Sequence, residues 1–165
     1  MNKSLRELAR AGVAALLLCS GAAQAQAGGG FDLITPTEAQ QAAKAELDAP
    51  PEIRTRQLAL PKGNVPGIRV LSPTTTPVAA PLRIELAFTP TPGARIVPAS
   101  FRVLYGLLKI DLTERMRKHA TVTEAGVVVD RASIPEGQHR LILQVADDLG
   151  NTAEQELRIR VGNPS

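Results

Sequence analysis

Apolar and polar side chains alternate at every second position in several short stretches between residues 65 and 162. Alternation of this kind is typical of strands that bury one face. The longer stretches are Leu82–Phe88, Phe101–Tyr105, Leu141–Val145 and Leu157–Val161, and the shorter ones are Ile68–Leu71 and Val127–Val129. Because turn residues separate these stretches, we predict an all-β domain over residues 65–162, an antiparallel sandwich of about seven strands.

One helical turn is expected inside this β domain. Asp111 and Glu114 have the spacing of a capping box, and Asp111 is suited to accept early backbone N–H groups. Positive side chains follow at Arg115, Arg117 and Lys118, where they complement the C-terminal end of a helix dipole. The pattern predicts a short helix over residues 112–118 with solvated basic side chains. The alternative is a basic binding helix.

Residues 28–64 form a leader of different composition. Thr35, Pro36 and Glu38 make a helix-start signature, good helix formers follow, and Pro50-Pro51 ends the helix. Leu47 is the only large apolar residue among the alanines of this helix. We therefore expect a flexible or partly helical leader that buries little area and is dispensable for folding. A wholly disordered leader is the alternative.

The first 27 residues have the features of a signal peptide. A basic start with Lys3, Arg6 and Arg10 precedes the apolar run Ala11–Cys19, and small residues near Ala27 suit cleavage. The run is short for a bilayer span, so a retained anchor is the less favoured alternative. We expect a mature N-terminus at Gln26 or Gly28, a periplasmic or secreted protein, and no membrane span after cleavage.

Cleavage changes the charge of the chain and its redox chemistry. Loss of the four charged signal-peptide residues lowers the formal net charge from +3 to +1. A nearly neutral chain lacks the electrostatic footprint of a nucleic-acid-binding protein. Cys19 is the only cysteine and leaves with the signal peptide, so the mature chain has no thiol and no disulfide.

The segment Ile134–Asn151 resembles the last hairpin of bacterial immunoglobulin-like domains. Gly137 precedes an alternating apolar strand, Gly150-Asn151 suits the reversal of the hairpin, and Asp147 suits an Asx-turn. The run Pro92–Phe101 is also similar to a connection between strands of that family. The resemblance implies an immunoglobulin-like sandwich over residues 65–162. It departs from the family pattern at His139, where Tyr is usual, and in lacking a disulfide pair and a Trp on the third strand.

Two groups of residues could hold a metal. Met116, His119 and His139 have side chains that suit copper in an export compartment, with solvated surface residues as the alternative. Asp147, Asp148 and Asn151 make an oxygen-rich loop for calcium, with a simple hairpin turn as the alternative. No hydrolase, nucleotide-binding or zinc-protease motif occurs in the chain, so we expect no enzymatic activity and no cofactor.

A partner-contact patch is expected from the leucine-rich stretch around Gly106. It comprises Leu104, Leu107, Leu108 and Ile110, some of which a regular strand would leave outside. The alternative is a bulge at Gly106 that buries them. The hypothesis from sequence is a non-enzymatic, exported immunoglobulin-like module that binds or positions another envelope protein. The alternative function is a small periplasmic copper carrier.

Overall fold

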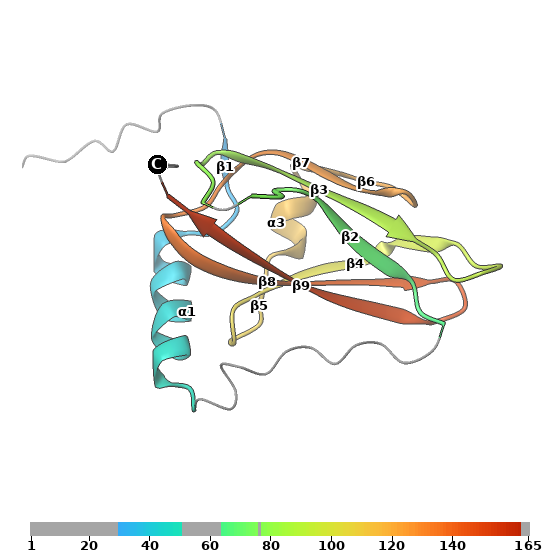
Figure 1. Cartoon of the computed structure of the whole chain (residues 1–165), viewed down its shortest axis with the longest axis horizontal. Helices are drawn as coiled ribbons and strands as arrows, with labels where there is room; N and C mark the ends of the chain where they lie inside the picture. The colour runs from blue at the N-terminus through green and yellow to red at the C-terminus, as the bar shows by residue number, and fades with distance from the viewer. Residues whose placement is uncertain (1–29, 51–63, 76, 163–165) are drawn as a thin grey trace, which may run out of the picture.

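The computed structural model describes residues 30–50, 64–75 and 77–162, and within them the chain forms two β-sheets packed face to face (Figure 1). The first sheet has the order β1-β7-β3-β2, with β6 also paired to β7, and the second has the order β5-β4-β8-β9. The first sheet contains β1 (Phe31–Asp32), β2 (Gly67–Ser72), β3 (Leu82–Thr89), β6 (Ala120–Val122) and β7 (Gly126–Ser133). The second contains β4 (Ile96–Tyr105), β5 (Ile110–Asp111), β8 (Gly137–Asp147) and β9 (Thr152–Val161). The all-β sandwich expected from the alternating pattern is confirmed.

The core lies between the inner faces of the two sheets. Leu143 on β8 and Ile84 on β3 are fully buried, whereas their neighbours Gln144 and Arg83 reach toward solvent. β3 keeps this alternation along its whole length. The period of two was therefore sufficient to separate core from surface positions on the long strands.

Helix α3 (Thr113–Arg117) lies between the two sheets in Figure 1 and connects β5 to β6. Asp111 accepts an early backbone N–H as predicted, from Thr113 to its Oδ1 at 2.8 Å. The capping box of Asp111 and Glu114 was wrong, because the helix begins one residue later and Leu112 is its N-cap. Leu112 and Met116, each 1% exposed, belong to the core. The chain thus crosses from one sheet to the other through a buried helical turn.

The segment before β2 contributes more to the core than the sequence led us to expect. β1 pairs in parallel with β7, and Leu33 and Ile34 follow it into the core with exposures of 0% and 1%. The helical part of the leader is confirmed as α1 (Pro36–Asp48). The expectation that the leader buries little was wrong for residues 33–42, because two large aliphatic side chains precede the helix and pack into the core.

The β8–β9 hairpin has the loop chemistry predicted for it. Asp147 is 3% exposed, and its carboxylate accepts the backbone N–H groups of Leu149 and Asn151 at 3.1 and 2.9 Å. Its second oxygen accepts the Thr91 hydroxyl at 2.6 Å. These bonds hold the pKa of Asp147 below its usual value despite burial. Gly150 has a φ of +82°, which the reversal requires.

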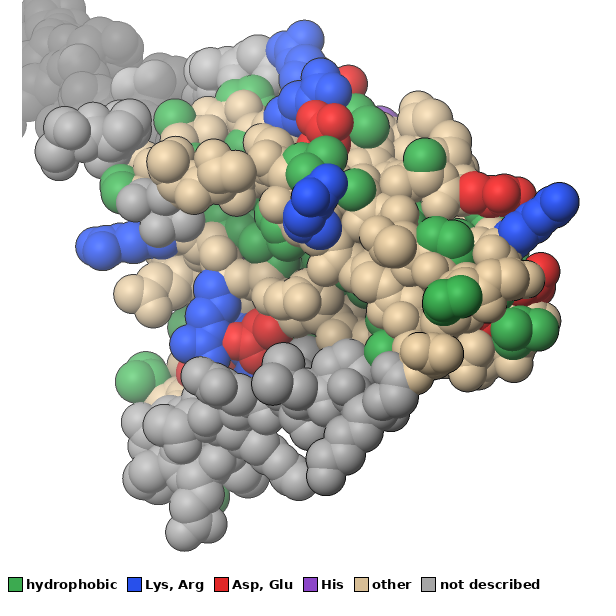
Figure 2. Space-filling model, turned by 45° about the vertical axis from the view of Figure 1, so that its right-hand side comes forward, with side chains coloured by type: hydrophobic (Ala, Val, Ile, Leu, Met, Phe, Trp, Pro, Cys, Tyr) green, Lys and Arg blue, Asp and Glu red, His purple; other side chains and the backbone are tan. Residues whose placement is uncertain are grey.

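Some predictions fall on residues outside those described. The signal peptide of residues 1–27 lies there, as do its cleavage site and residues 51–63 of the leader. No helix among the residues that are described is long and apolar enough to cross a membrane. On the face drawn in Figure 2, basic and acidic side chains lie interspersed and hydrophobic ones form small separate spots.

Candidate functional site

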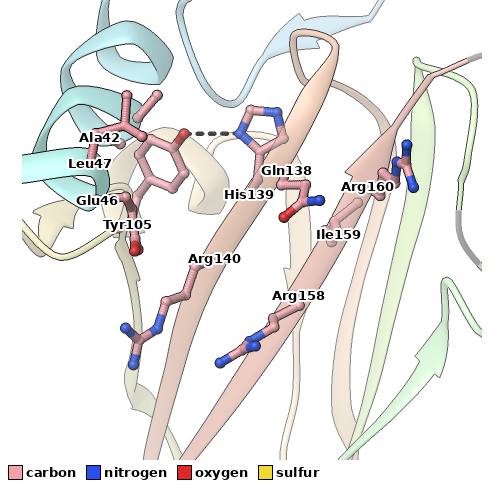
Figure 3. A pocket seen from close by; sticks show the side chains of 12 residues that line it. Ala42, Glu46, Leu47, Tyr105, Gln138, His139, Arg140, Arg158, Ile159 and Arg160 are labelled. Carbon is pink, nitrogen blue, oxygen red and sulfur yellow. Dashed lines mark hydrogen bonds between the residues drawn. The ribbon is translucent and has the colours of Figure 1, made fainter. Parts of the chain in front are cut away.

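A groove of about 700 Å³ lies between α1 and the neighbouring ends of β8 and β9 (Figure 3). Helix α1 supplies one wall through Ala42, Ala43 and Leu47. Tyr105 and Gly106, where β4 ends, lie at its base together with His139. The facing wall comes from β8 and β9 and carries arginine side chains. The groove therefore has one mainly apolar side, which also carries Glu46, and one side of positive charge.

The start of α1 follows from local sequence. The Thr35 hydroxyl accepts the Glu38 backbone N–H at 3.3 Å, while the Glu38 carboxylate accepts the Thr35 backbone N–H at 2.9 Å. This is the predicted capping box, with Pro36 as the first helical residue. Four early N–H groups of a helix lack partners inside the helix, so these bonds define where α1 begins.

Helix α1 approaches the sandwich closely because two small residues meet. A Cβ built on Gly106 would lie 3.1 Å from the Ala42 Cβ, a distance tighter than ordinary contact. Gly106 also has a φ of +65°, which disfavours other residues. Any side chain at position 106 would push α1 outward, so Gly106 sets the distance between the walls of the groove.

An ion pair between helices fastens α1 to α3. Arg115 donates from Nη1 and Nη2 to the two carboxylate oxygens of Glu38 at 2.7 and 2.9 Å, and from Nη1 to the Leu33 carbonyl at 2.9 Å. The bonds from Arg115 are the main reason that the pKa of Glu38 falls to about 2. Arg115 was expected to be solvated, and this was wrong because Glu38, 77 residues away, lies against it.

Tyr105 and His139 form a buried pair at the base of the groove. The Tyr105 hydroxyl lies 2.9 Å from His139 Nδ1, and His139 Nε2 lies 2.8 Å from the Pro135 carbonyl. A carbonyl only accepts, so Nε2 carries the proton and Nδ1 accepts from the tyrosine hydroxyl. Burial lowers the pKa of His139 and raises that of Tyr105 to about 12. Both groups are therefore neutral near pH 7 and satisfy each other.

The positive wall is built from cross-strand neighbours on the outer face of the second sheet. Arg140 on β8 pairs directly with Arg158 on β9 in the register of the hairpin. Glu156 lies between them, accepting from Arg140 Nε and Nη2 at 2.9 and 2.8 Å and also from Arg158 Nε. Arg160 follows two residues later on the same strand. One carboxylate thus holds two guanidinium groups in place beside a third.

The side chains that line the groove suit the binding of a ligand. Tyr105 and His139 are only 2% and 5% exposed and already bonded to each other. The accessible chemistry of the groove is guanidinium donors on one side, and aliphatic carbon with the Glu46 carboxylate on the other. Guanidinium groups bind carboxylates through paired hydrogen bonds, whereas small apolar walls accept aliphatic side chains.

The four residues of the predicted partner-contact patch lie in a hairpin. β4 ends at Tyr105, a turn follows, and β5 returns at Ile110. Leu104 pairs with Asp111 and Tyr105 pairs with Ile110, so Leu104 and Ile110 lie on opposite faces of the sheet. Leu107 is half-buried, and Leu108 is 54% exposed. Leu104, Leu107, Leu108 and Ile110 thus do not share one face, and partner contact through them stays a prediction.

The proposed copper ligands lie in three different environments. Met116 is in the core, and His119 stacks its ring on Phe31 with centroids 4.0 Å apart. Both ring nitrogens of His139 are engaged in hydrogen bonds. Within the described part of the chain, no group of three or more His, Cys, Asp or Glu could hold a metal ion. The copper carrier stays a prediction without geometric support.

The three residues considered for calcium are engaged in the hairpin loop. Asn151 donates from Nδ2 to both carboxylate oxygens of Asp147, at 3.1 and 3.0 Å. Asp148 Oδ1 accepts the Arg95 backbone N–H at 2.9 Å. These bonds fit the simple hairpin turn, which is the alternative to a calcium site in the sequence analysis.

Sequence reasoning missed the groove, because its walls come from segments about 100 residues apart. The arginine wall of the groove could have been predicted in part. Arg158 and Arg160 alternate with apolar residues and therefore share the outer face of their strand. The position of α1 beside them could not be derived in this way, because it depends on the contact between Ala42 and Gly106.

Comparisons with known proteins give little further guidance. No family model matches the chain, and no curated protein matches it. Among solved structures, CopC from Methylosinus trichosporium OB3b is similar at 17% identity and a TM-score of 0.35, covering 53% of this chain and 86% of that one.

Proposed function

We propose that this protein is a non-enzymatic, exported immunoglobulin-like module that binds or positions another protein of the envelope through the groove beside α1. The observation that carries the proposal is the groove itself, in which α1, joined to α3 by the ion pair of Glu38 and Arg115, faces arginine side chains. Leu47 lines it with 74% of the residue exposed. A large exposed apolar side chain beside a polar rim is a common feature of protein contact sites.

The expected export of this protein supports an envelope protein as its partner. The basic start, the short apolar run and the small residues before Gly28 favour passage across the inner membrane and then residence in the periplasm or secretion. The resemblance of Ile134–Asn151 to immunoglobulin-like domains fits a binding role, although that fold hosts many tasks. The protein contributes a binding surface, and binding requires no chemical step.

Site-specific photo-crosslinking in living cells tests this proposal. A photoreactive amino acid replaces Leu47 in the groove or, as a matched control, Leu149, which is 66% exposed at the tip of the β8–β9 hairpin. We expect a discrete adduct with one envelope protein from position 47 and none from position 149. The same adducts at both positions, or none at position 47, would refute the proposal.

A further inference from the structure

The β9 wall of the groove carries positive charge at a regular spacing. Arg158 and Arg160 occupy alternate positions of the strand, and both line the groove. Alternate residues of an extended strand are about 6.6 Å apart. An extended chain lying alongside β9 has the same spacing between its own alternate side chains. Two of these side chains can therefore face Arg158 and Arg160, one each.

Arg158 and Arg160 keep positive charge on this wall accessible to a ligand. Glu156, whose side chain is 13% exposed, is shared between Arg140 and Arg158. Arg158 keeps 63% of its side chain exposed. Within the part of the chain that the structure describes, Arg160 makes no ion pair. Arg140 and Arg158 lie directly opposite each other, and Glu156 is the anion that offsets the repulsion between their positive groups.

The helix wall has a different character. Ala42 and Ala43 present methyl groups, and Leu47 adds an exposed aliphatic side chain. Glu46 also lines this wall, and it contributes to the raised pKa of Tyr105. A ligand in the groove therefore meets guanidinium groups on one side and mainly aliphatic carbon on the other.

The geometry points to an acidic, extended segment of a partner protein as the occupant of this groove. Carboxylates at two alternate positions of the segment bind Arg158 and Arg160, and the aliphatic residue between them faces Leu47. Alternation along an extended chain sends these side chains to opposite walls. This inference rests on the proposed function and specifies the chemistry of the partner.

A defined peptide tests the inference. The probe is a rhodamine-labelled decapeptide with a central Glu-Leu-Glu sequence, and its comparison has Gln-Leu-Gln. We expect saturable binding of the acidic peptide at low salt, weakened roughly tenfold by Arg160→Glu, a loss of about 1.4 kcal/mol. Arg158→Gln weakens it in the same direction, and Glu46→Gln strengthens it. Arg69→Glu, an exposed change on β2, is the matched control.

Several outcomes would overturn the inference. Equal binding of the Gln peptide, or an equal loss in Arg69→Glu, would remove the role of charge in the groove. Preferential binding of phosphatidylglycerol vesicles, abolished by Arg160→Glu, would assign these arginines to lipid headgroups. Thermal unfolding of each variant confirms that the fold is retained.

The proposed function and the acidic segment can be refuted independently of each other. An adduct at position 47 that persists in Arg160→Glu would keep the docking groove and refute the acidic segment. Specific binding of the acidic peptide without any adduct in cells would keep the acidic site and refute the envelope partner.

Discussion

The buried pair of Tyr105 and His139 makes the stability of the protein depend on pH in the range where a histidine titrates. His139 has a lowered pKa because burial disfavours its charged form. The unfolded chain then binds a proton more readily, near the ordinary pKa of about 6.5. The contribution of His139 is therefore complete above pH 6.5 and is lost as the pH falls below that value.

We expect the free energy of unfolding to fall between pH 7.5 and pH 5.5. Urea denaturation measures it, with His139→Gln expected to reduce the pH dependence and His119→Gln to leave it unchanged. These are the two histidines of the chain, and His119 lies exposed against Phe31. Equal effects of the two substitutions would contradict the assignment to the buried ring.

Leu33 shows how a single residue can attach a leader to a core. It is fully buried, whereas Leu47 on the same segment is 74% exposed. We expect Leu33→Ala to cost about 2–5 kcal/mol through lost burial and a cavity, and Leu47→Ala to change stability by about 0.5 kcal/mol or less. Chemical denaturation compares them, and a small loss at both positions would restore the idea of a dispensable leader.

At the scale of elements, the pairing of Glu38 with Arg115 joins α1 to α3. The pKa of Glu38 lies at about 2, below its ordinary value of 4.5, so its contribution to stability is present above pH 4.5 and lost as the pH falls toward 2. We expect Glu38→Gln to lower the free energy of unfolding by about 1–3 kcal/mol at pH 7. The loss of unfolding free energy in Glu38→Gln should be smaller at pH 2.5.

The matched control for Glu38→Gln is Glu114→Gln. Glu114 lies in the first turn of α3 and is exposed. Denaturation curves at the two pH values should show a pH-dependent difference for Glu38→Gln alone. A loss of equal size at pH 7 and pH 2.5 would mean that the charge of Glu38 is not what holds the helices together.

The register of the β8–β9 hairpin can be tested with neighbouring residues. Leu143 is fully buried, and Gln144 lies on the outer face, where it donates to Glu154 at 2.6 Å. We expect Leu143→Ala to cost about 2–5 kcal/mol and Gln144→Ala to change stability by about 0.5 kcal/mol. Equal losses in urea denaturation would indicate a different register.

At the scale of the whole molecule, copper binding distinguishes a carrier from a docking module. Occupying His139 with a metal requires breaking its bonds to Tyr105 and Pro135, and Met116 is buried in the core. Calorimetric titration of the mature protein with copper should therefore give no saturable one-to-one heat. Stoichiometric binding that His139→Gln abolishes would instead support the copper carrier.

The long strands and the start of α1 could be predicted from sequence because their causes are local. The alternation of Leu82–Phe88 needs only the period of a strand, and the capping box needs only Thr35 and Glu38 three residues apart. The Asp147 loop is equally local, since its partners Leu149 and Asn151 are close in the chain. These features are determined by neighbours that the sequence itself places together.

The groove and its attachment were decided by tertiary structure. Ala42 meets Gly106, Glu38 meets Arg115, and Tyr105 meets His139 across segments that lie far apart in the chain. Short pairings such as β1 with β7 carry too few residues to leave a periodic signal. Contacts between distant segments depend on how whole elements pack, because side-chain volume and charge select among arrangements that local patterns allow equally.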